Sequence, residues 1–250
     1  MQIYLNFERV LTESELTTLR EMVQRRGNRE PLQYIIGNVQ FCGWELTVTP
    51  SVLIPRPETE MLAERGWQSL AELVTHHSSL VTALDFGTGS GCLAIALASK
   101  VPGAEVHALD ASTEALNIAR QNATKQNVTI HFHQGNAFEA LKATDSRFDL
   151  IISNPPYIPS AEIETLDPEV RDHEPCSALD GGADGLDFYR LLAMEAQNWL
   201  KPTGKILLEF GDGQADAVKK TFESQKFVVE SIECDYSQRP RILSARPPLS

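Results

Sequence analysis

Short runs of hydrophobic residues alternate with longer segments of helical periodicity along most of the chain. An apolar run of about four to eight residues is typical of a buried strand, whereas apolar residues spaced three and four apart predict a helix with one buried face. The expected strands are residues 81–86, 105–109, 128–133, 148–153, 205–210, 227–234 and 242–245. The expected helices are residues 57–76, 112–125, 186–200 and 214–224, with a further helix opening after residue 91.

This alternation predicts the fold class. Strands separated by helices favour a parallel sheet that carries helices on its faces. We therefore expect an α/β protein with a doubly wound, mostly parallel seven-stranded sheet and an antiparallel closing strand. At 250 residues and 42% hydrophobic composition, the chain is long enough for one such core. We expect the core to occupy residues 51–250, and residues 1–50 to form a short N-terminal helix and β-hairpin region.

The N-terminal region begins with a helix signal. Thr12 and Glu15 have the spacing of a capping box, and Leu16, Leu19 and Val23 then form one apolar stripe. Such a stripe needs a partner surface, and we expect the main domain to provide it; the alternative is another protein.

Two further segments lead into the core. Residues 31–48 contain many aromatic and β-branched residues and predict a short hairpin with a turn at Gly37 and Asn38. In residues 53–60, Pro57 suits the first turn of a helix, and the preceding residues predict a rigid lip over a ligand with Arg56 free to pair a carboxylate.

Composition narrows the possible surroundings and partners. The net charge is -12 and basic residues are not clustered, which disfavours nucleic acid as a partner. The sequence has neither an apolar stretch of the ~20 residues that span a bilayer nor an apolar signal segment at the start. The four cysteines contain no Cys-x-x-Cys pair. His131 and His133 point to the same side of a strand and have no partner at metal spacing, so we expect two exposed strand residues. We expect a cytoplasmic protein without a metal, a disulfide framework or a membrane anchor.

The strand at 81–86 is followed by a glycine-rich loop. Gly87, Gly89 and Gly91 let the backbone pass close to a ligand, and the next helix presents free N–H groups to an anionic part of it. Asp110 lies 19 residues beyond Gly91, at a spacing that suits binding to ribose hydroxyls. Residues 89–94 also match the G-x-G-x-x-A dinucleotide pattern, so a nicotinamide enzyme remains an alternative at this point.

Residues 154–157, Asn-Pro-Pro-Tyr, follow the strand at 148–153. Ligands of open α/β sheets bind beyond the carboxyl ends of the strands. The Asn154 side chain and the Pro155 carbonyl could accept the two hydrogens of a planar NH2 group, with Tyr157 as a wall beside it. The alternative is an ordinary turn at the end of a strand. The long acidic segment at 158–184 predicts a lid or binding loop.

The combination of Asp85-Phe86-Gly87-Thr88-Gly89-Ser90-Gly91 with Asn-Pro-Pro-Tyr resembles the class I S-adenosylmethionine-dependent methyltransferases that modify planar amino or amide nitrogens. Residues 53–60, Leu-Ile-Pro-Arg-Pro-Glu-Thr-Glu, and the segments Glu174-Pro175 and 181–186 narrow the resemblance to the release factor glutamine methyltransferase family, also called HemK or PrmC. The similarity covers about residues 29–246.

The resemblance implies a function and a site. The family transfers a methyl group from S-adenosylmethionine to the glutamine amide nitrogen in the Gly-Gly-Gln motif of class I peptide chain release factors, and we expect a monomer that needs no metal. Two departures stand out, because the family usually has Asp at the position of Asn136 and a longer N-terminal helical domain. The implied catalytic residues are Asn154, Pro155, Pro156 and Tyr157; the implied cofactor-binding residues are Asp85, Gly87, Thr88, Gly89, Ser90, Gly91, Asp110, Asn136, Ala137 and Asn154.

Four alternatives remain. An adenine-N6 methyltransferase of nucleic acid would also use Asn-Pro-Pro-Tyr to hold an exocyclic amine. A glutamine methyltransferase of a ribosomal protein is closer to the same chemistry. A cofactor-binding interaction module would bind S-adenosylmethionine without turnover. The nicotinamide dehydrogenase leaves Asn-Pro-Pro-Tyr without a role.

Overall fold

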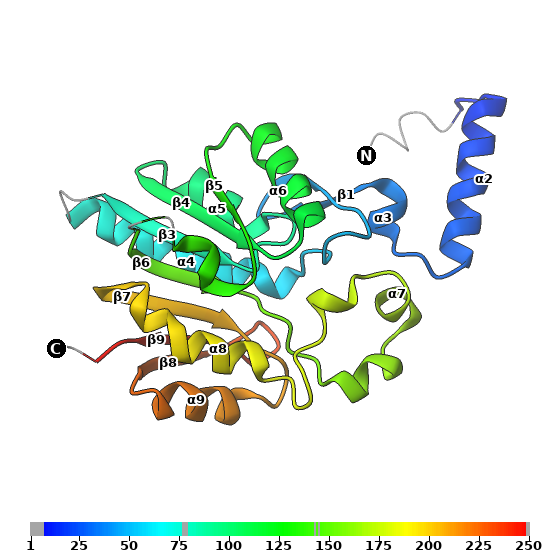
Figure 1. Cartoon of the computed structure of the whole chain (residues 1–250). Coiled ribbons are helices and arrows are strands. Elements are labelled where there is room, and N and C mark those ends of the chain that lie inside the picture. The colour runs from blue at the N-terminus through cyan, green and yellow to red at the C-terminus, as the bar shows by residue number, and fades with distance from the viewer. Residues whose placement is uncertain (1–7, 77–79, 143, 145, 249–250) are drawn as a thin grey trace.

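The computed structural model describes residues 8–76, 80–142, 144 and 146–248. Its centre is a seven-stranded sheet in the order β5-β4-β3-β6-β7-β9-β8 (Figure 1). Neighbouring strands from β5 to β7 are parallel, and β9 pairs antiparallel with both β7 and β8. The predicted fold class is confirmed. The strands are β3 (Val81–Phe86), β4 (Ala104–Asp110), β5 (His131–Gln134), β6 (Phe148–Ser153), β7 (Leu200–Glu209), β8 (Val228–Cys234) and β9 (Pro240–Arg246).

The central strands are buried on both faces. All six residues of β3 are buried, and in β6 only Asp149 is partly exposed. Strands covered on both faces have continuous apolar runs rather than alternating ones. This is why the sequence predicted β3 and β6. The chain order reverses between β3 and β6, because β4 extends the sheet on one side and β6 on the other. This reversal places a crevice at their carboxyl ends.

Helices cover both faces of the sheet (Figure 1). One face is covered by α4 (Pro57–His76), α5 (Cys92–Lys100) and α6 (Thr113–Lys125), and the other by η1 (Ala137–Leu141), α8 (Asp187–Glu195), η4 (Ala196–Asn198) and α9 (Ala215–Ser224). The Ser112 side chain caps α6 by accepting a hydrogen bond from the Ala115 N–H at 3.1 Å. The start of α4 at Pro57 and its end near residue 76 match the sequence prediction.

The N-terminal region consists of α2 (Glu13–Gly27), α3 (Leu32–Ile36), β1 (Asn38–Phe41) and β2 (Trp44–Thr47). The capping box at Thr12 is present, but no residue of α2 is buried. Leu19 is 44% exposed and Val23 is 70% exposed, and Figure 1 shows α2 standing apart from the sheet. Packing of its apolar stripe against the main domain is therefore wrong; Arg26 and Arg29 instead reach Glu169 through exposed ion pairs.

The hairpin turns at a different place from the one predicted. Gly37 has φ +85° and ends α3, whereas Cys42 and Gly43 form the turn between β1 and β2. Asn122 of α6 holds this hairpin to the core: it accepts from the Thr47 N–H at 2.7 Å and donates to the Thr47 and Ser90 carbonyls, both at 2.9 Å. The hairpin is therefore tied to the glycine-rich loop.

Three other segments differ from prediction. Strand β5 begins at His131 rather than residue 128. The expected helix at 186–200 ends at Glu195, and β7 begins at Leu200. Phe148 pairs with Leu200 and Leu150 with Lys205, so Pro202 and Gly204 lie in an irregularity that the ladder skips. The segment at 158–184 contains the short helices η2 (Ser160–Thr165), α7 (Pro168–Arg171) and η3 (Cys176–Ala178).

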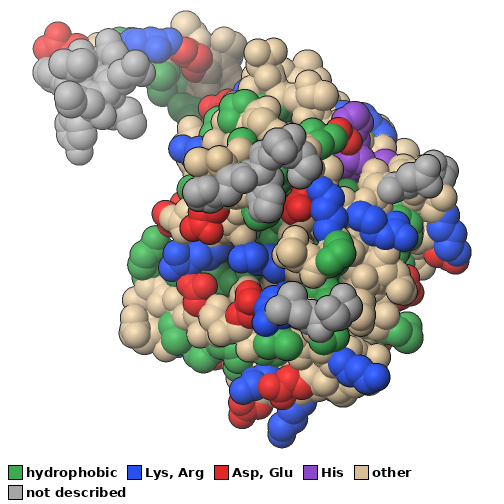
Figure 2. Space-filling model, turned by 90° about the vertical axis from the view of Figure 1, so that its left-hand side faces the viewer, with side chains coloured by type: hydrophobic (Ala, Val, Ile, Leu, Met, Phe, Trp, Pro, Cys, Tyr) green, Lys and Arg blue, Asp and Glu red, His purple; other side chains and the backbone are tan. Residues whose placement is uncertain are grey.

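The surface matches the mixed charge of the sequence. On the face drawn in Figure 2, acidic and basic side chains are interspersed with hydrophobic ones. Within the described ranges, no helix is both long and apolar enough to cross a membrane.

Candidate functional site

A cavity of about 450 Å³ lies beyond the carboxyl ends of β3, β4 and β6. It is bounded by the segment before α4, the glycine-rich loop, the loop after β5, the Asn-Pro-Pro-Tyr segment, η3 and α8. Of the residues implied from sequence, seven line it: Gly87, Gly89, Asp110, Asn136, Ala137, Asn154 and Pro156. The remaining six, Asp85, Thr88, Ser90, Gly91, Pro155 and Tyr157, are not among the lining residues.

Asp85 supports the glycine-rich loop from inside the core. Its Oδ2 accepts from the Thr88 hydroxyl at 2.6 Å and from the Ala94 N–H at 3.1 Å. Its Oδ1 is buried and has no hydrogen-bond partner among the described residues. Burial raises the pKa of Asp85 to about 7 against the lowering effect of these hydrogen bonds. The free oxygen marks a place where a ligand's donor group would be favourable.

Asp110 closes the loop onto the end of β4. Its Oδ2 accepts from the Gly89 N–H at 2.8 Å, and its Oδ1 accepts from the Ser112 N–H at 2.9 Å. Each oxygen keeps a second lone pair toward the cavity that the residue lines. Gly91 has a different role, because a Cβ there would lie 3.1 Å from the Ala119 Cβ and press α5 away from α6.

The loop after β5 holds a strained residue at the cavity wall. Ala137 has φ +59°, a left-handed conformation that non-glycine residues adopt rarely. Such outliers persist only where the surroundings fix them, and they gather at binding sites. Here the Gly135 N–H donates to the Asp110 carbonyl at 3.1 Å, which joins this loop to β4. Asn136 and Ala137 both line the cavity, as the sequence predicts for a ligand-binding loop.

Asn154 follows the last residue of β6 and lines the cavity. Its Nδ2 donates to the Thr59 hydroxyl at 3.1 Å, so its Oδ1 is the side-chain atom left to accept. Pro156 also lines the cavity, whereas Tyr157 is half-buried against the hydrophobic cluster that contains Tyr189 and Phe210. Tyr157 is not among the residues that line the cavity.

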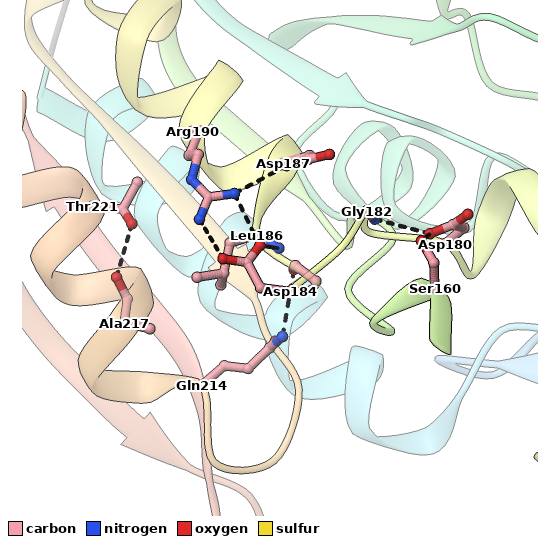
Figure 3. A network of polar contacts seen from close by, with 11 residues as sticks. Ser160, Asp180, Gly182, Asp184, Leu186, Asp187, Arg190, Gln214, Ala217 and Thr221 are labelled. Atoms are coloured by element: carbon pink, nitrogen blue, oxygen red, sulfur yellow. Dashed lines mark hydrogen bonds and ion pairs between the residues drawn. The ribbon is translucent and has the colours of Figure 1, made fainter. Parts of the chain in front are cut away.

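Three glycines press on the back of the Asn-Pro-Pro-Tyr segment. A Cβ on Gly181 would lie 2.8 Å from the Tyr157 Cα, one on Gly185 would lie 2.3 Å from the Tyr157 carbonyl oxygen, and one on Gly211 would lie 2.9 Å from the Tyr157 ring. The Gln214 Nε2 donates to the Tyr157 carbonyl at 2.9 Å and to the Gly185 carbonyl at 3.4 Å. Figure 3 shows the Gln214 side chain reaching the loop before α8. The backbone at Gly181 and Gly185 thus packs directly on the backbone of Tyr157, which fixes the position of the Asn-Pro-Pro-Tyr segment.

Ion pairs and hydrogen bonds brace the loop that carries Gly181 and Gly185 (Figure 3). Asp180 accepts from the Ser160 hydroxyl at 2.7 Å and the Gly182 N–H at 2.9 Å, and these bonds lower its pKa. Arg190 of α8 binds Asp184 at 2.5 Å and Asp187 at 3.0 Å. The loop is thereby held to α8 on one side and to the segment at 158–184 on the other.

The segment before α4 and the segment at 158–184 meet through Glu174. Its Oε1 lies 2.5 Å from the Arg56 Nη2, and its Oε2 accepts from the Ile54 N–H at 3.2 Å. Arg56 therefore pairs a carboxylate, as predicted, although the partner belongs to the chain itself. Leu53 and Pro175, which flank this pair, both line the cavity.

Several residues around the site were not predicted. Phe188 and Leu191 of α8 line the cavity, but their spacing is that of any helix face packed on a core. Thr59 and Glu209 are buried next to Asn154 in space while lying far from it in sequence. A signal for Glu209 is its position after an apolar strand run, where a buried acid is rare.

Three histidines, His107, His131 and His133, form a cluster on the neighbouring strands β4 and β5. His107 is buried; its Nδ1 lies 2.8 Å from the His133 Nε2 and its Nε2 lies 2.8 Å from the Glu105 Oε1. Burial lowers the pKa of His107 and of His133. The prediction of two exposed strand residues holds for His131 but is wrong for His133, which is half-buried. In the parts of the chain that are described, no group of three or more side chains has the arrangement of a metal site.

Comparison with known proteins identifies the family. A methyltransferase domain model matches residues 77–241, and a PrmC N-terminal domain model matches residues 1–37. A release factor glutamine methyltransferase of Geobacter sulfurreducens is 45% identical over 238 residues, covering 95% of this chain and 79% of that protein. The chain belongs to the release factor glutamine methyltransferase family. The enzyme of the same name from Chlorobaculum tepidum is 40% identical, covering 98% of this chain and 84% of that protein.

Solved structures agree on the fold of this family member. A methyltransferase from Pyrococcus furiosus superposes with a TM-score of 0.58 at 22% identity, covering 82% of this chain and 89% of that one. At this identity the likeness shows the fold alone.

The cavity fits the S-adenosylmethionine on which this methyltransferase family depends. Phe188, Leu191 and Ala137 offer apolar surface for a flat ring, and Asp110 offers acceptors for hydroxyl groups. Asp85 supports the loop whose glycines line the cavity through its bonds to the Thr88 hydroxyl and the Ala94 N–H, and its Oδ1 has no partner among the described residues.

Proposed function

We propose that this protein transfers a methyl group from S-adenosylmethionine to the side-chain amide nitrogen of the glutamine in the Gly-Gly-Gln motif of class I peptide chain release factors. The observation that carries the proposal is the state of Asn154. Its Nδ2 is already bonded to Thr59, so it offers the cavity an oxygen acceptor. An acceptor there suits the NH2 group of a primary amide.

The proposed catalytic role of Asn154 and Pro155 is to hold that NH2 group. One hydrogen is accepted by the Asn154 Oδ1 and the other by the Pro155 carbonyl oxygen, which fixes the plane of the amide. The nitrogen lone pair of an amide is delocalised into its carbonyl group and attacks poorly. Acceptors on both hydrogens favour the electron distribution that lets nitrogen attack. The N–C bond forms as the bond between the methyl group and sulfur breaks, which leaves S-adenosylhomocysteine, and one of the two hydrogens passes to water as a proton.

Bound S-adenosylmethionine supplies an electrophilic methyl group on a positively charged sulfur. The residues proposed to hold it are Gly87, Gly89, Asp110, Asn136 and Ala137, since all of them line the cavity. Asp85, Thr88, Ser90 and Gly91 act from behind by shaping the loop. Pro156 and Tyr157 act by holding Asn154 and Pro155 in place.

A protein substrate is favoured over nucleic acid by charge. The net charge of -12 repels a polyphosphate backbone, whereas a basic protein would be attracted. We propose that the protein works as a monomer in the cytoplasm, on a release factor loop that enters between the segments joined by Glu174.

The test is methylation of a class I release factor by the purified protein and S-adenosylmethionine, followed by mass spectrometry of the peptide with the Gly-Gly-Gln motif. The expected result is a gain of one methyl group on that glutamine, and no gain in a release factor with Gln→Asn in the motif. If the cofactor binds by calorimetry but the motif glutamine stays unmodified, the proposed substrate is wrong. Parallel reactions with ribosomal proteins and with an adenine-containing duplex would then identify which alternative applies.

A further inference from the structure

Thr59 joins the acceptor residue to the first turn of α4. Its hydroxyl accepts from the Asn154 Nδ2 at 3.1 Å across 95 residues of sequence. Its own N–H donates to the Arg56 carbonyl at 3.1 Å, and the residue is 2% exposed. A hydroxyl has one hydrogen to donate, and a buried one needs an acceptor for it.

Glu209 provides that acceptor. It is the last residue of β7, and β7 pairs with β6 so that Ser153 lies opposite Leu208; Asn154 and Glu209 therefore follow on adjacent strand ends. Glu209 is 3% exposed, and its interaction with the Thr59 side chain lowers the pKa of its carboxyl group. Its Oε2 has no partner among the described residues.

Charged and titratable groups from three elements surround Glu209. Arg241 of β9 and Arg56 favour its ionised form, and Glu58 of α4 disfavours it. The Tyr189 hydroxyl of α8 donates to its backbone carbonyl at 3.0 Å, and the phenol pKa values of Tyr157 and Tyr189 are raised in part by the Glu209 charge. Burial has the largest effect and raises the pKa of Glu209 to about 7.

We propose that Thr59 and Glu209 are positioning residues that orient the Asn154 amide, so that its oxygen and not its NH2 group faces the substrate amide. This inference rests on the proposed function. An ionised carboxylate accepts only, so the Thr59 hydrogen points to Glu209 and the hydroxyl oxygen accepts from the Asn154 Nδ2.

Protonation of Glu209 reverses the direction of this chain of hydrogen bonds. The neutral carboxyl can donate to the Thr59 oxygen, which frees the Thr59 hydrogen to point to Asn154. The Asn154 amide then turns its oxygen to Thr59 and presents its NH2 group to the substrate NH2 group. Two donors facing each other do not bind, so the turned amide no longer holds the glutamine for transfer.

The first test compares Thr59→Val, which keeps the shape but removes the hydroxyl, with Thr59→Ser, which keeps the hydroxyl. We expect Thr59→Val to lower kcat on the release factor by about 10- to 100-fold with cofactor affinity unchanged, because the Asn154 amide loses its only described restraint. Thr59→Ser should stay within about threefold of the parent. Equal losses in both variants would overturn the proposal, because they would reflect packing and not the hydroxyl.

The second test uses Glu209→Gln, which removes the titration without removing the side chain. We expect the parental kcat to rise with pH through an inflection near pH 7, and the inflection to be absent in Glu209→Gln. An unchanged pH profile in this variant would overturn the proposal even if Thr59→Val failed to fold.

A substrate-free readout separates this inference from the proposed function. The side-chain NH2 resonances of Asn154 should shift near pH 7 in the parent and stay constant in Glu209→Gln, whichever protein is methylated. If the parent fails to modify the release factor but the resonances titrate as expected, the proposed substrate is wrong and the positioning role of Thr59 and Glu209 stands. If the release factor is modified but the resonances do not titrate, the proposed role of Glu209 is wrong.

Discussion

Glu174 binds Arg56 across 118 residues of sequence, with the Arg56 Nη2 2.5 Å from the Glu174 Oε1. The Glu174 side chain is 1% exposed and that of Arg56 is 32% exposed. The pair joins two segments that line opposite parts of the cavity through Leu53 and Pro175. It therefore ties the segment before α4 to the segment at 158–184 at the edge of the cavity.

We predict that Arg56→Ala raises the KM for S-adenosylmethionine several-fold and lowers the free energy of unfolding by about 1–3 kcal/mol. Breaking a fully buried pair costs about 3–5 kcal/mol, and the partial exposure of Arg56 reduces this. Arg171→Ala is the matched control, because it breaks an exposed pair with Asp172 in the same segment. Steady-state kinetics and urea unfolding check both; an equal effect of the two variants would contradict a special role for Arg56.

Asn154→Ala should reduce kcat by about 100- to 1,000-fold, the range seen when one preorganised polar contact to the reacting group is removed. Cofactor affinity should change little, because other residues form most of the cavity wall. Methylation kinetics and cofactor calorimetry measure the two effects. A parental turnover rate would show that Asn154 has no role in transfer.

Gly185→Ala should lower kcat by at least about tenfold. The new Cβ would lie 2.3 Å from the Tyr157 carbonyl oxygen and push the Asn-Pro-Pro-Tyr segment toward the cavity. Gly213→Ala is the matched control: its φ of +77° is as strained as the +74° of Gly185, but nothing lies within 4 Å of its Cβ. We expect each variant to lose about 1 kcal/mol of stability from backbone strain. The contact with Tyr157 should cost Gly185→Ala further stability, and only this variant should lose turnover. Equal turnover in the two variants would show that the contact between residue 185 and the Tyr157 carbonyl oxygen has no effect on catalysis.

Asp85 should make the cofactor-free protein less stable as pH rises from about 4 to about 7. Its pKa is raised from 3.8 to about 7, so the folded state holds a proton that the unfolded state has released. Asp85→Asn removes this dependence. Between about pH 5 and pH 8 we expect the parent to lose about 2 kcal/mol more unfolding free energy than the variant.

Urea unfolding at the two pH values measures this difference. Asp180→Asn is a control of opposite sign, because hydrogen bonds lower the pKa of the exposed Asp180 carboxyl from 3.8. Its contribution is present above that value and is lost only as pH falls through the lowered pKa. The same pH slope in the parent and in Asp85→Asn would mean that Asp85 is ionised in the folded protein.

Sequence analysis predicted an element best where the residues at its own ends set its limits. β3 and β6 are continuous apolar runs bounded by glycine or by Asn-Pro, and α4 starts at a proline, so their limits follow from local chemistry. The start of β7 was missed because Pro202 and Gly204 look like the end of a loop, whereas the ladder skips them. The capping box predicted α2 as a helix but carried no information on what it contacts.

Sequence analysis predicted only the part of the cavity wall that is formed by sequence motifs. The glycine-rich loop and Asn154 lie at strand ends that the fold brings together, which follows from the parallel topology. The contacts that orient Asn154 come from Thr59 and Glu209, and those that hold Tyr157 come from Gln214. These depend on the register of β6 with β7 and on the packing of α4, which local patterns do not encode.

The long sequence distance between Tyr157 and Gln214 also sets an order of assembly during synthesis. Strands β3 to β5, with the glycine-rich loop, Asp110 and Ala137, leave the ribosome first and can pair among themselves. The Asn-Pro-Pro-Tyr segment is made next. Gln214, which donates to the Tyr157 carbonyl, and the end of β7, which carries Glu209, are made about 50 residues later. A nascent chain therefore completes its glycine-rich half before the half that holds Asn154 in place, and premature termination before residue 209 leaves a product without the contacts that fix Asn154.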